Sequence, residues 1–279
     1  MVSRSQTARS ECSELTTQNY QLDLIHPTAI VDSSAQVPAS CRIGPYCVVG
    51  AEVEMGENCE LVSHVVLHGP TRMGRNNRIF PFAAVGIEPQ DVSYKGEGTR
   101  LEIGEDNSIR EYVTINRGTA LDAGVTRLGN ENWVMAYVHF AHDCQIGSKT
   151  IFANACQLAG HVTVGDWAIF GATTLVHQFV HIGAHAFTGM GTYLPQDVPP
   201  YVTAAGNMAK PYGINSEGLK RRGFSPDTIE ALKRAYRTLY RTGLPLEEAK
   251  GRLEEQARAC PEVRAIVDFL KNSKRGIIR

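Results

Sequence analysis

Apolar residues recur at every sixth position through most of the chain. The first run starts at Ile25 and reaches Val85 without a miss, and further runs cover 103–115 and 128–182. This period is neither the 3.6-residue period of a helix nor the two-residue alternation of a strand. It is typical of a short strand and a corner, repeated three times per turn of a triangular prism. The pattern predicts a parallel β-helix in which residues eighteen apart stack at about the 4.8 Å strand spacing.

Two polar, glycine-rich stretches interrupt this repeat, at 87–102 and 117–127. Neither contains the regular apolar positions that would point into the prism. We therefore expect both to be loops that leave the prism. Loops on a rigid scaffold are where binding and catalytic residues tend to lie.

A helical pattern replaces the repeat after Pro199 and Pro200. Ser225-Pro226-Asp227 has the N-cap, the first-position proline and the acidic first turn of a helix. Further helices are expected near 246–258 and 262–272. The predicted organisation is a disordered tail at 1–23, a β-helix at 24–200, and a linker with a helical domain at 201–279.

The composition is that of an ordinary globular protein, with 43% hydrophobic residues, 20% charged residues and a net charge of −1. No apolar stretch is long enough for a membrane span, and the first twenty residues lack the apolar core of an export signal. We expect a cytoplasmic protein without stable membrane insertion. Seven cysteines, odd in number and without a C-x-x-C pair, favour reduced thiols that mostly fill the core.

The charge is unevenly distributed along the chain. Residues 215–279 contain fifteen Lys and Arg against nine Asp and Glu, which makes this segment +6 and the remainder −7. One interpretation is a solvated helical surface. The other is a docking face for an acidic protein or a phosphorylated ligand.

Five of the nine histidines lie between 139 and 181. The eighteen-residue coil places His142, Gly160 and Gln178 on one edge of the prism, with His161 and His177 beside them. A lone histidine is more often structural, but several polar residues stacked on one edge favour a site.

The residues of this edge suggest a chemistry. His142 is a base beside the Asp143 carboxylate, and the Gly160 amide could donate to a developing oxyanion. The chain has no G-x-S-x-G motif and no credible Ser-His-Asp set. Activation of a substrate nucleophile is therefore favoured over a covalent enzyme intermediate. Neither G-x-x-x-x-G-K-S/T nor G-x-G-x-x-G occurs, which excludes nucleotide loops of those kinds.

Two other interpretations remain open on the residues alone. His139 with His142, and His177 with His181, have metal-ligand spacings, and a trimeric β-helix can assemble zinc sites between subunits. A zinc-dependent hydro-lyase is thus the alternative enzyme. A non-catalytic β-helix scaffold is the third possibility.

Several motifs together resemble one family, the acyl-carrier-protein–UDP-N-acetylglucosamine O-acyltransferases, which catalyse the first step of lipid A biosynthesis. The motifs are His139-Phe-Ala-His142-Asp143-Cys144, Leu158-Ala-Gly-His161-Val, Val176-His-Gln-Phe179, Gln196-Asp-Val-Pro-Pro-Tyr201 and Asn215-Ser-Glu-Gly-Leu-Lys-Arg-Arg-Gly-Phe224. The resemblance covers roughly 24–279. It implies a left-handed β-helix homotrimer with active sites between neighbouring subunits. We expect no cofactor, no metal and no nucleic-acid partner.

The resemblance also implies a reaction, the transfer of a 3-hydroxyacyl chain from acyl carrier protein to the glucosamine 3-position of UDP-N-acetylglucosamine. His142 matches the general base, Asp143 its support and Gly160 the oxyanion donor. Sugar-contacting positions match Gln90, Asp91 and His161, and cleft-lining positions match His139, His177 and Gln178. Positions at the nucleotide and phosphate end match Asn215, Glu217, Arg221 and Arg222. The basic helical domain would suit an acidic carrier protein.

Two departures from the family pattern concern the substrate. Ser93 stands where the family usually has a lysine, and Lys95 lies two residues further on. Either Lys95 replaces that lysine or one substrate contact is lost. Phe187 and Met190 match positions that set acyl-chain length, and members with longer chains have glycine at the place of Met190. The resemblance therefore predicts a short acyl chain of about ten carbons, unless the groove runs elsewhere and Met190 is a core residue.

The nature of the acceptor stays open between a 3-hydroxyl and a 3-amino group. The N-acylating relative of the same pathway normally has an extra N-terminal domain. The repeat begins at Ile25, which leaves no room for one and favours the O-acyltransferases.

Overall fold

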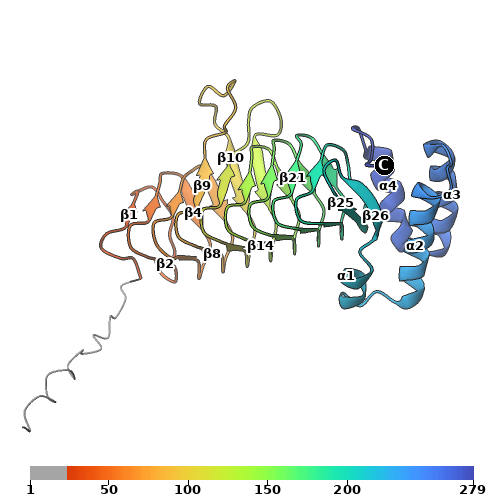
Figure 1. Ribbon diagram of the computed structural model, residues 1–279. Coiled ribbons are helices and arrows are strands. Elements are labelled where there is room, and N and C mark those ends of the chain that lie inside the picture. The colour runs from red at the N-terminus through yellow and green to blue at the C-terminus, as the bar shows by residue number, and fades with distance from the viewer. Residues whose placement is uncertain (1–23) are drawn as a thin grey trace, which may run out of the picture.

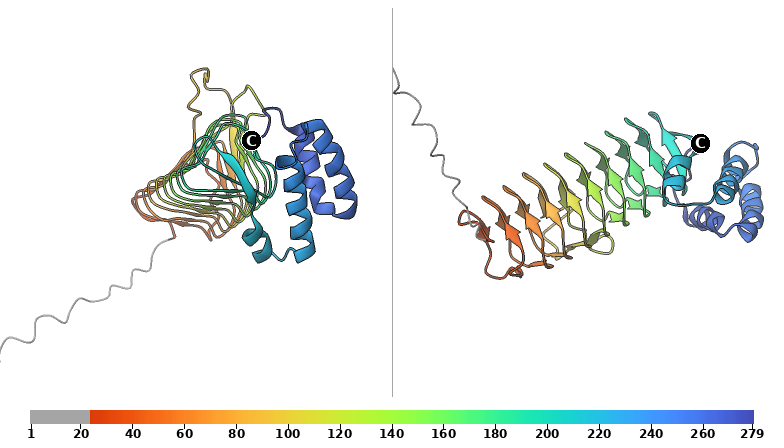
Figure 2. Two further views of the ribbon diagram at one scale, coloured as in Figure 1. Left: turned by 45° about the vertical axis from the view of Figure 1, so that its right-hand side comes forward. Right: turned by 90° about the horizontal axis from the view of Figure 1, so that it is seen from below.

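The computed structural model describes residues 24–279, so the tail predicted at 1–23 lies outside the described residues. Short parallel strands wind into a left-handed β-helix with three flat sheets (Figure 1). Seen nearly along its axis, the prism has a triangular outline, and the helices lie beside its C-terminal end (Figure 2). The architecture expected from the six-residue repeat is confirmed.

Each sheet contains every third strand. The nine-stranded sheet contains β1 (Ile30–Val31), β3 (Val48–Val49), β6 (Val66–Leu67), β9 (Ala84–Ile87), β12 (Thr114–Asn116), β15 (His139–Phe140), β18 (Gln157–Leu158), β21 (Leu175–Val176) and β24 (Tyr193–Leu194). The seven-stranded sheet contains β4 (Val53–Met55), β7 (Thr71–Met73), β10 (Arg100–Ile103), β13 (Val125–Leu128), β16 (Gln145–Ile146), β19 (Thr163–Val164) and β22 (His181–Ile182). The ten-stranded sheet contains β2 (Arg42–Ile43), β5 (Glu60–Leu61), β8 (Arg78–Ile79), β11 (Ser108–Ile109), β14 (Trp133–Val134), β17 (Ile151–Phe152), β20 (Ile169–Phe170), β23 (Phe187–Thr188), β25 (Val202–Ala205) and β26 (Lys210–Ile214).

One apolar side chain per repeat points into the prism. Phe140, Phe152 and Phe170 are fully buried, and the rings of Phe152 and Phe170 stack at 4.5 Å. The glycine that follows many of these residues allows the coils to lie close together. A Cβ atom at Gly44 would lie 1.7 Å from the carbonyl oxygen of Val62 in the next coil, which no side chain could tolerate.

The register explains how the two loops leave the prism. Most paired residues are eighteen apart, as in His139 opposite Gln157. Across the first loop Met73 pairs with Ile103, and across the second Ile103 pairs with Leu128. The extra residues form the segments 88–99 and 117–124, which we call loop 1 and loop 2. Both connect the nine-stranded to the seven-stranded sheet and therefore project from the same edge (Figure 1).

The C-terminal part differs from expectation in two places. Strand β25 pairs with β23 beyond the proline pair and then with β26 in antiparallel fashion, so the ten-stranded sheet extends past residue 200. A short helix α1 (Ser216–Arg221), capped by Asn215, was not expected either. Neither element could be predicted from the sequence, because neither has apolar residues at every sixth position or a long run with the 3.6-residue period of a helix.

The longer helices follow the sequence prediction. Helix α2 (Pro226–Tyr240) begins at the Ser225 cap, whose hydroxyl accepts a hydrogen bond from the Thr228 amide. The other expected helices correspond to α3 (Leu246–Ala259) and to η1 (Pro261–Val263) with α4 (Arg264–Asn272). Within 24–279, no helix combines the length and the apolarity needed to cross a bilayer. The six described cysteines are free thiols, five of them buried.

Candidate active site

His142 and Asp143 form an ion-pair-like contact at the edge from which both loops project. Nδ1 of His142 lies 2.9 Å from Oδ2 of Asp143. The imidazole is 16% exposed, whereas the carboxylate is only 1% exposed. A buried carboxylate thus faces one ring nitrogen and leaves Nε2 as the nitrogen that can meet a substrate.

Loop 2 holds the Asp143 carboxylate from the other side. The Thr119 amide donates to Oδ1 at 2.9 Å, and the Thr119 hydroxyl donates to Oδ2 at 2.6 Å. The backbone amide of Asp143 in turn donates to Thr126 at 2.8 Å. Burial alone would raise the pKa of Asp143, but the hydrogen bonds from His142 and Thr119 outweigh it and hold this pKa below its usual value. The carboxylate therefore stays charged beside the imidazole.

Gly160 lies directly next to the His142 ring in the following coil. A Cβ atom at this position would lie 2.5 Å from Cε1 and 2.7 Å from Nε2 of His142. Only glycine leaves the imidazole room in its present place. Among the described residues, the Gly160 amide has no hydrogen-bond acceptor. The amide is therefore available to a ligand next to the imidazole.

His161 continues the edge beside this pair. Its ring meets the His142 ring edge-on at 5.0 Å and stacks on Phe179 at 4.3 Å. Its Nδ1 lies 3.0 Å from Oδ2 of Asp122 in loop 2. Asp91 of loop 1 accepts two hydrogen bonds from Ser93, which lower its pKa, and the nearby His142 and His161 lower it further. Both loops thus bring a carboxylate to the histidine edge.

A buried arginine ties loop 1 to the prism. Arg117, at the start of loop 2, donates to the carbonyl oxygens of Gly69 at 2.6 Å and Gly86 at 3.0 Å. It also donates to the Tyr94 hydroxyl of loop 1 at 3.1 Å, and its side chain is only 6% exposed. Glu88 approaches it at 4.0 Å. The segment from Arg117 to Thr119 therefore holds loop 1 with one end and Asp143 with the other.

The other residues expected at this edge form no hydrogen bond with the His142–Asp143 pair. His139 lies on β15, its Nδ1 2.7 Å from the Thr114 hydroxyl, and burial followed by the nearby His142 lowers its pKa. His177 and the exposed Gln178 follow β21, one coil beyond Gly160. Gln90 is an exposed residue of loop 1.

Ser93, for which the resemblance implies a lysine position, has its own hydrogen-bond partner. Both the amide and the hydroxyl of Ser93 donate to Asp91 at 2.8 Å. The backbone of Lys95 donates to Glu97 at 2.9 Å, and its side chain is exposed. Ser93 therefore shapes the Asp91 turn.

The residues expected at the nucleotide end lie on another edge. Asn215 donates to the His185 carbonyl oxygen at 3.2 Å, and Arg222 lies 3.1 Å from Nδ1 of His185 and 5.1 Å from the Trp167 ring. His185 connects the seven-stranded to the ten-stranded sheet, whereas His142 connects the nine-stranded to the seven-stranded sheet. Glu217 and Arg221 are exposed on α1. One chain therefore does not bring the two groups together.

Phe187 and Met190 lie near the third edge of the prism, which joins the ten-stranded to the nine-stranded sheet. Phe187 points outward from β23 and continues a row of apolar residues on the ten-stranded sheet. This row consists of Trp133, Ile151, Ile169 and Phe187. Met190 is 79% exposed, which contradicts the view of it as a core residue of the single chain.

Sequence reasoning missed Thr119, Asp122 and Arg117. All three lie in loop 2, where no repeat places them. Their contacts join residues that are 23 to 48 positions apart in the sequence. The metal-ligand spacings noted in the sequence do not assemble either. Within 24–279, the cluster of possible ligands is His142, Asp143 and His161, without His139, His177 or His181.

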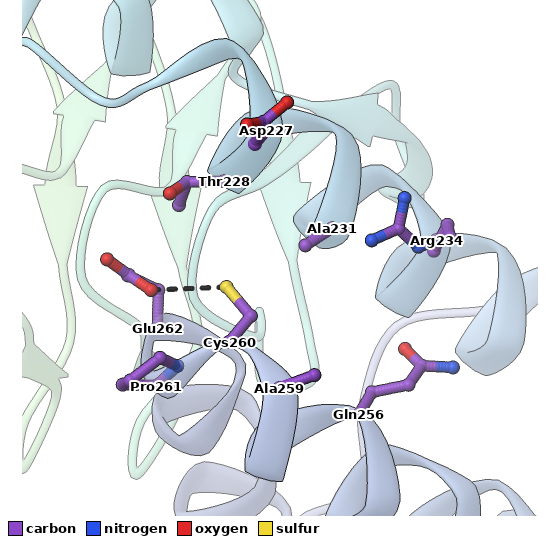
Figure 3. A pocket seen from close by; sticks show the side chains of 9 residues that line it. All are labelled: Asp227, Thr228, Ala231, Arg234, Gln256, Ala259, Cys260, Pro261 and Glu262. Atoms are coloured by element: carbon purple, nitrogen blue, oxygen red, sulfur yellow. Dashed lines mark hydrogen bonds between the residues drawn. The ribbon is translucent and has the colours of Figure 1, made fainter.

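A separate pocket of about 470 Å³ lies between α2, α3 and η1 (Figure 3). Arg234, Asp227 and Glu262 give it mixed charge, and Glu262 contacts the thiol of Cys260 at 3.1 Å. None of the predicted site residues lines it.

The chain is similar to known proteins over nearly its whole length. The family model "Udp N-acetylglucosamine O-acyltransferase; Domain 2" matches residues 197–278. An acyl-carrier-protein–UDP-N-acetylglucosamine O-acyltransferase of Janthinobacterium sp. (strain Marseille) is 55% identical over 92% of this chain and 100% of the relative. That of Herminiimonas arsenicoxydans is 53% identical over the same shares.

Solved structures agree with these relatives. The UDP-N-acetylglucosamine O-acyltransferase (LpxA) of Moraxella catarrhalis matches with a TM-score of 0.91 at 45% identity, over 92% of this chain and 100% of that one. LpxA of Acinetobacter baumannii matches with a TM-score of 0.90 at 45% identity, over the same shares.

Proposed function

The chain belongs to the acyl-carrier-protein–UDP-N-acetylglucosamine O-acyltransferases, the acyltransferases of lipid A biosynthesis, and on this premise we propose how its own residues carry the reaction. The acyl donor is a 3-hydroxyacyl thioester of acyl carrier protein, and the acceptor is the glucosamine 3-hydroxyl of UDP-N-acetylglucosamine. His142 is the general base. The observation that carries this role is the partly exposed imidazole backed by the buried Asp143 carboxylate.

The proton moves first. Nδ1–H of His142 donates to Asp143, so Nε2 has a free lone pair and accepts the proton of the 3-hydroxyl. The sugar oxygen attacks the thioester carbonyl carbon, and the negative charge moves to the carbonyl oxygen. The unpaired Gly160 amide donates to this oxyanion. Asp143 stabilises the imidazolium, because its carboxylate remains charged.

The intermediate then collapses. The carbon–sulfur bond breaks, the carbonyl re-forms, and the His142 imidazolium returns its proton to the leaving thiolate. The products are the 3-O-acylated sugar nucleotide and the carrier protein with a free thiol. Gln90, Asp91 and His161 surround the acceptor sugar, and His139, His177 and Gln178 line the cleft beyond it.

The second half of the site comes from a neighbouring subunit of a homotrimer. Asn215, Glu217, Arg221 and Arg222 would bind the nucleotide and its phosphates, but they lie on a different edge from His142. Two chains side by side can present both edges to one substrate. Mixed trimers test this arrangement. Trimers of His142→Ala chains and trimers of Arg222→Ala chains should each be inactive, and trimers that contain both kinds of chain should regain part of the activity.

The carrier protein docks on the basic C-terminal segment, which is +6 over residues 215–279. Exposed Lys220 lies next to the nucleotide residues on α1. The odd number of cysteines, free and mostly buried where described, supports a reducing cytoplasmic location.

The direct test is the product formed from UDP-N-acetylglucosamine and a mixture of 3-hydroxyacyl carrier proteins. Mass spectrometry should show one acyl chain, and mild alkali should release it because it is an ester. An alkali-stable amide would contradict the 3-hydroxyl acceptor. His142→Ala should lower turnover by roughly 10²–10⁴ with an unchanged circular dichroism spectrum. His26→Ala, at the N-terminal end of the prism before β1, is the matched control.

A further inference from the structure

The donor atoms at the histidine edge have a second property, their mutual spacing. His142, Asp143 and His161 each offer one ligand atom, and these atoms lie within 4.8 Å of one another. Asp143 Oδ2 is 2.9 Å from His142 Nδ1 and 3.8 Å from His161 Nδ1. Asp122 adds a fourth atom, because its Oδ2 lies 3.0 Å from His161 Nδ1. Two nitrogens and one carboxylate oxygen therefore converge, and the Asp122 carboxylate lies beside one of these nitrogens.

These distances suit a tetrahedral zinc ion. Ligands bound at about 2.0–2.1 Å in tetrahedral geometry lie about 3.3 Å from one another, and zinc prefers imidazole and carboxylate ligands. The observed separations of 2.9, 3.0 and 3.8 Å lie on both sides of this value. We propose that His142, His161, Asp143 and Asp122 form a zinc-binding site, and that zinc bound there inhibits acyl transfer.

The surroundings hold two of the four ligands in place. Thr119 fixes the Asp143 carboxylate through both oxygens, as hydrogen-bond partners commonly fix a metal-ligating carboxylate. Stacking on Phe179 fixes the His161 ring. Asp122 is 55% exposed on loop 2 and leaves the site open to an ion from solvent. Two carboxylates balance the charge of one zinc ion.

Inhibition follows from which nitrogen the metal occupies. Zinc on Nδ1 of His142 takes the place of the proton that this nitrogen shares with Asp143, and the proton moves through solvent to Nε2. The neutral imidazole then carries its single proton on Nε2. That nitrogen can no longer accept the proton of the acceptor hydroxyl. This consequence rests on the proposed base role of His142, whereas binding itself rests on the geometry alone.

The metal here is an inhibitor, which distinguishes the site from the hydro-lyase alternative. Its ligands also differ from the two histidine pairs with metal-ligand spacing in the sequence, which are His139 with His142 and His177 with His181. The site lies within one chain, because His142 contacts Asp143, and His161 lies near both Asp143 and Asp122 in the single prism.

Cobalt(II) provides a readout of binding that does not depend on activity. Titration of the metal-free protein should give one bound ion per chain and the intense visible absorption of tetrahedral cobalt, which zinc then removes. Asp122→Asn should weaken zinc binding at least about tenfold. Asp106→Asn, a carboxylate elsewhere on the prism that contacts Asn76, should leave zinc affinity unchanged.

The same preparations separate the two parts of the proposal. The acyl-transfer rate of each protein is measured with increasing zinc, relative to its own metal-free rate. The rate of the unchanged chain should fall, and Asp122→Asn should need about tenfold more zinc for the same decrease. A lack of stoichiometric binding, a weak octahedral cobalt spectrum, or equal affinity of both variants would overturn the site, and leave the base role of His142 intact. Stoichiometric zinc with an unchanged rate would overturn the inhibition and the base role together.

Discussion

The Thr119 hydroxyl donates to Oδ2 of Asp143 across 2.6 Å, and the Thr119 amide donates to Oδ1. Loop 2 therefore does more than cover the edge of the prism: it orients the carboxylate on which the His142 imidazole depends. Thr119 touches no reacting atom in the proposed reaction. It is a positioning residue that acts through Asp143.

Thr119→Val keeps the shape of the side chain and removes the hydroxyl donor. We expect kcat to fall about tenfold, because a hydrogen bond to a charged group is worth about 1.5–3 kcal/mol. KM for the sugar nucleotide should change little, since Thr119 does not face the substrate. Thr119→Ser should restore kcat. A change in KM alone, or no rescue by serine, would show that Thr119 only maintains the loop.

Gly160→Ala tests the contact between Gly160 and His142. A methyl group would lie 2.5 Å from Cε1 of the imidazole, so the ring must move out of its present position. We expect kcat/KM to fall at least about a hundredfold, since small displacements of a catalytic group can have such effects. The thermal midpoint should drop by only a few degrees. Gly251→Ala in α3, where a Cβ atom meets nothing within 4 Å, is the matched control. Activity near the unchanged level would refute the crowded geometry.

Arg117→Lys tests the attachment of loop 1. Lysine keeps the charge, but it cannot reach the carbonyl oxygens of Gly69 and Gly86 and the Tyr94 hydroxyl together, as the planar guanidinium does. We expect faster amide hydrogen exchange in 88–99 and a KM for the sugar nucleotide raised several-fold, because Gln90 and Asp91 lie in this loop. Tyr94→Phe removes one of the three contacts and should have a smaller effect in the same direction. Unchanged exchange in 88–99 would contradict this role.

The repeat predicts one part of the site and not the other, for a physical reason. The positions of His142, Gly160 and Gln178 follow from counting eighteen residues, because inward apolar side chains and backbone pairing leave the coils no other register. Thr119, Asp122 and Arg117 belong to segments without a repeat, whose path depends on individual hydrogen bonds. The same holds for β26 and α1, which are too short for a period to be visible. The available signal is the motif Arg117-Gly118-Thr119, which is polar, contains glycine and begins the loop predicted at 117–127.

His185 makes the stability of the protein depend on pH. Burial and, to a lesser extent, the Arg222 guanidinium lower its pKa to about 4, against the weaker opposite effect of Asp166. The neutral ring accepts the Arg222 contact and lies among Trp167, Tyr201 and Phe224. Between pH 6.5 and about 4 the unfolded chain binds a proton that the folded chain does not. Stability should therefore fall as the pH decreases through this range, and this contribution should level off below pH 4.

The thermal midpoint measured from pH 7 to pH 4 checks this dependence. His185→Gln cannot titrate, so its curve should be flatter than that of the unchanged chain by a few degrees, corresponding to no more than about 3 kcal/mol before allowance for the partial exposure of the ring. Carboxylates elsewhere titrate equally in both proteins and cancel in the difference. Parallel curves would mean that His185 is protonated in the folded state.

Met190→Gly tests what limits the acyl chain. Met190 is exposed beside the outward row of Trp133, Ile151, Ile169 and Phe187, an apolar surface along which an acyl chain could lie. Its side chain adds about three heavy atoms beyond Cβ at the end of this surface, and each buried methylene of a ligand contributes about 0.8 kcal/mol. Removing the side chain should move the preferred donor from about ten carbons toward fourteen, and Met190→Ala should give an intermediate optimum. The measurement is kcat/KM for a series of 3-hydroxyacyl carrier proteins of increasing length. If all three proteins prefer the same length, the acyl chain follows another path and Met190 does not limit it.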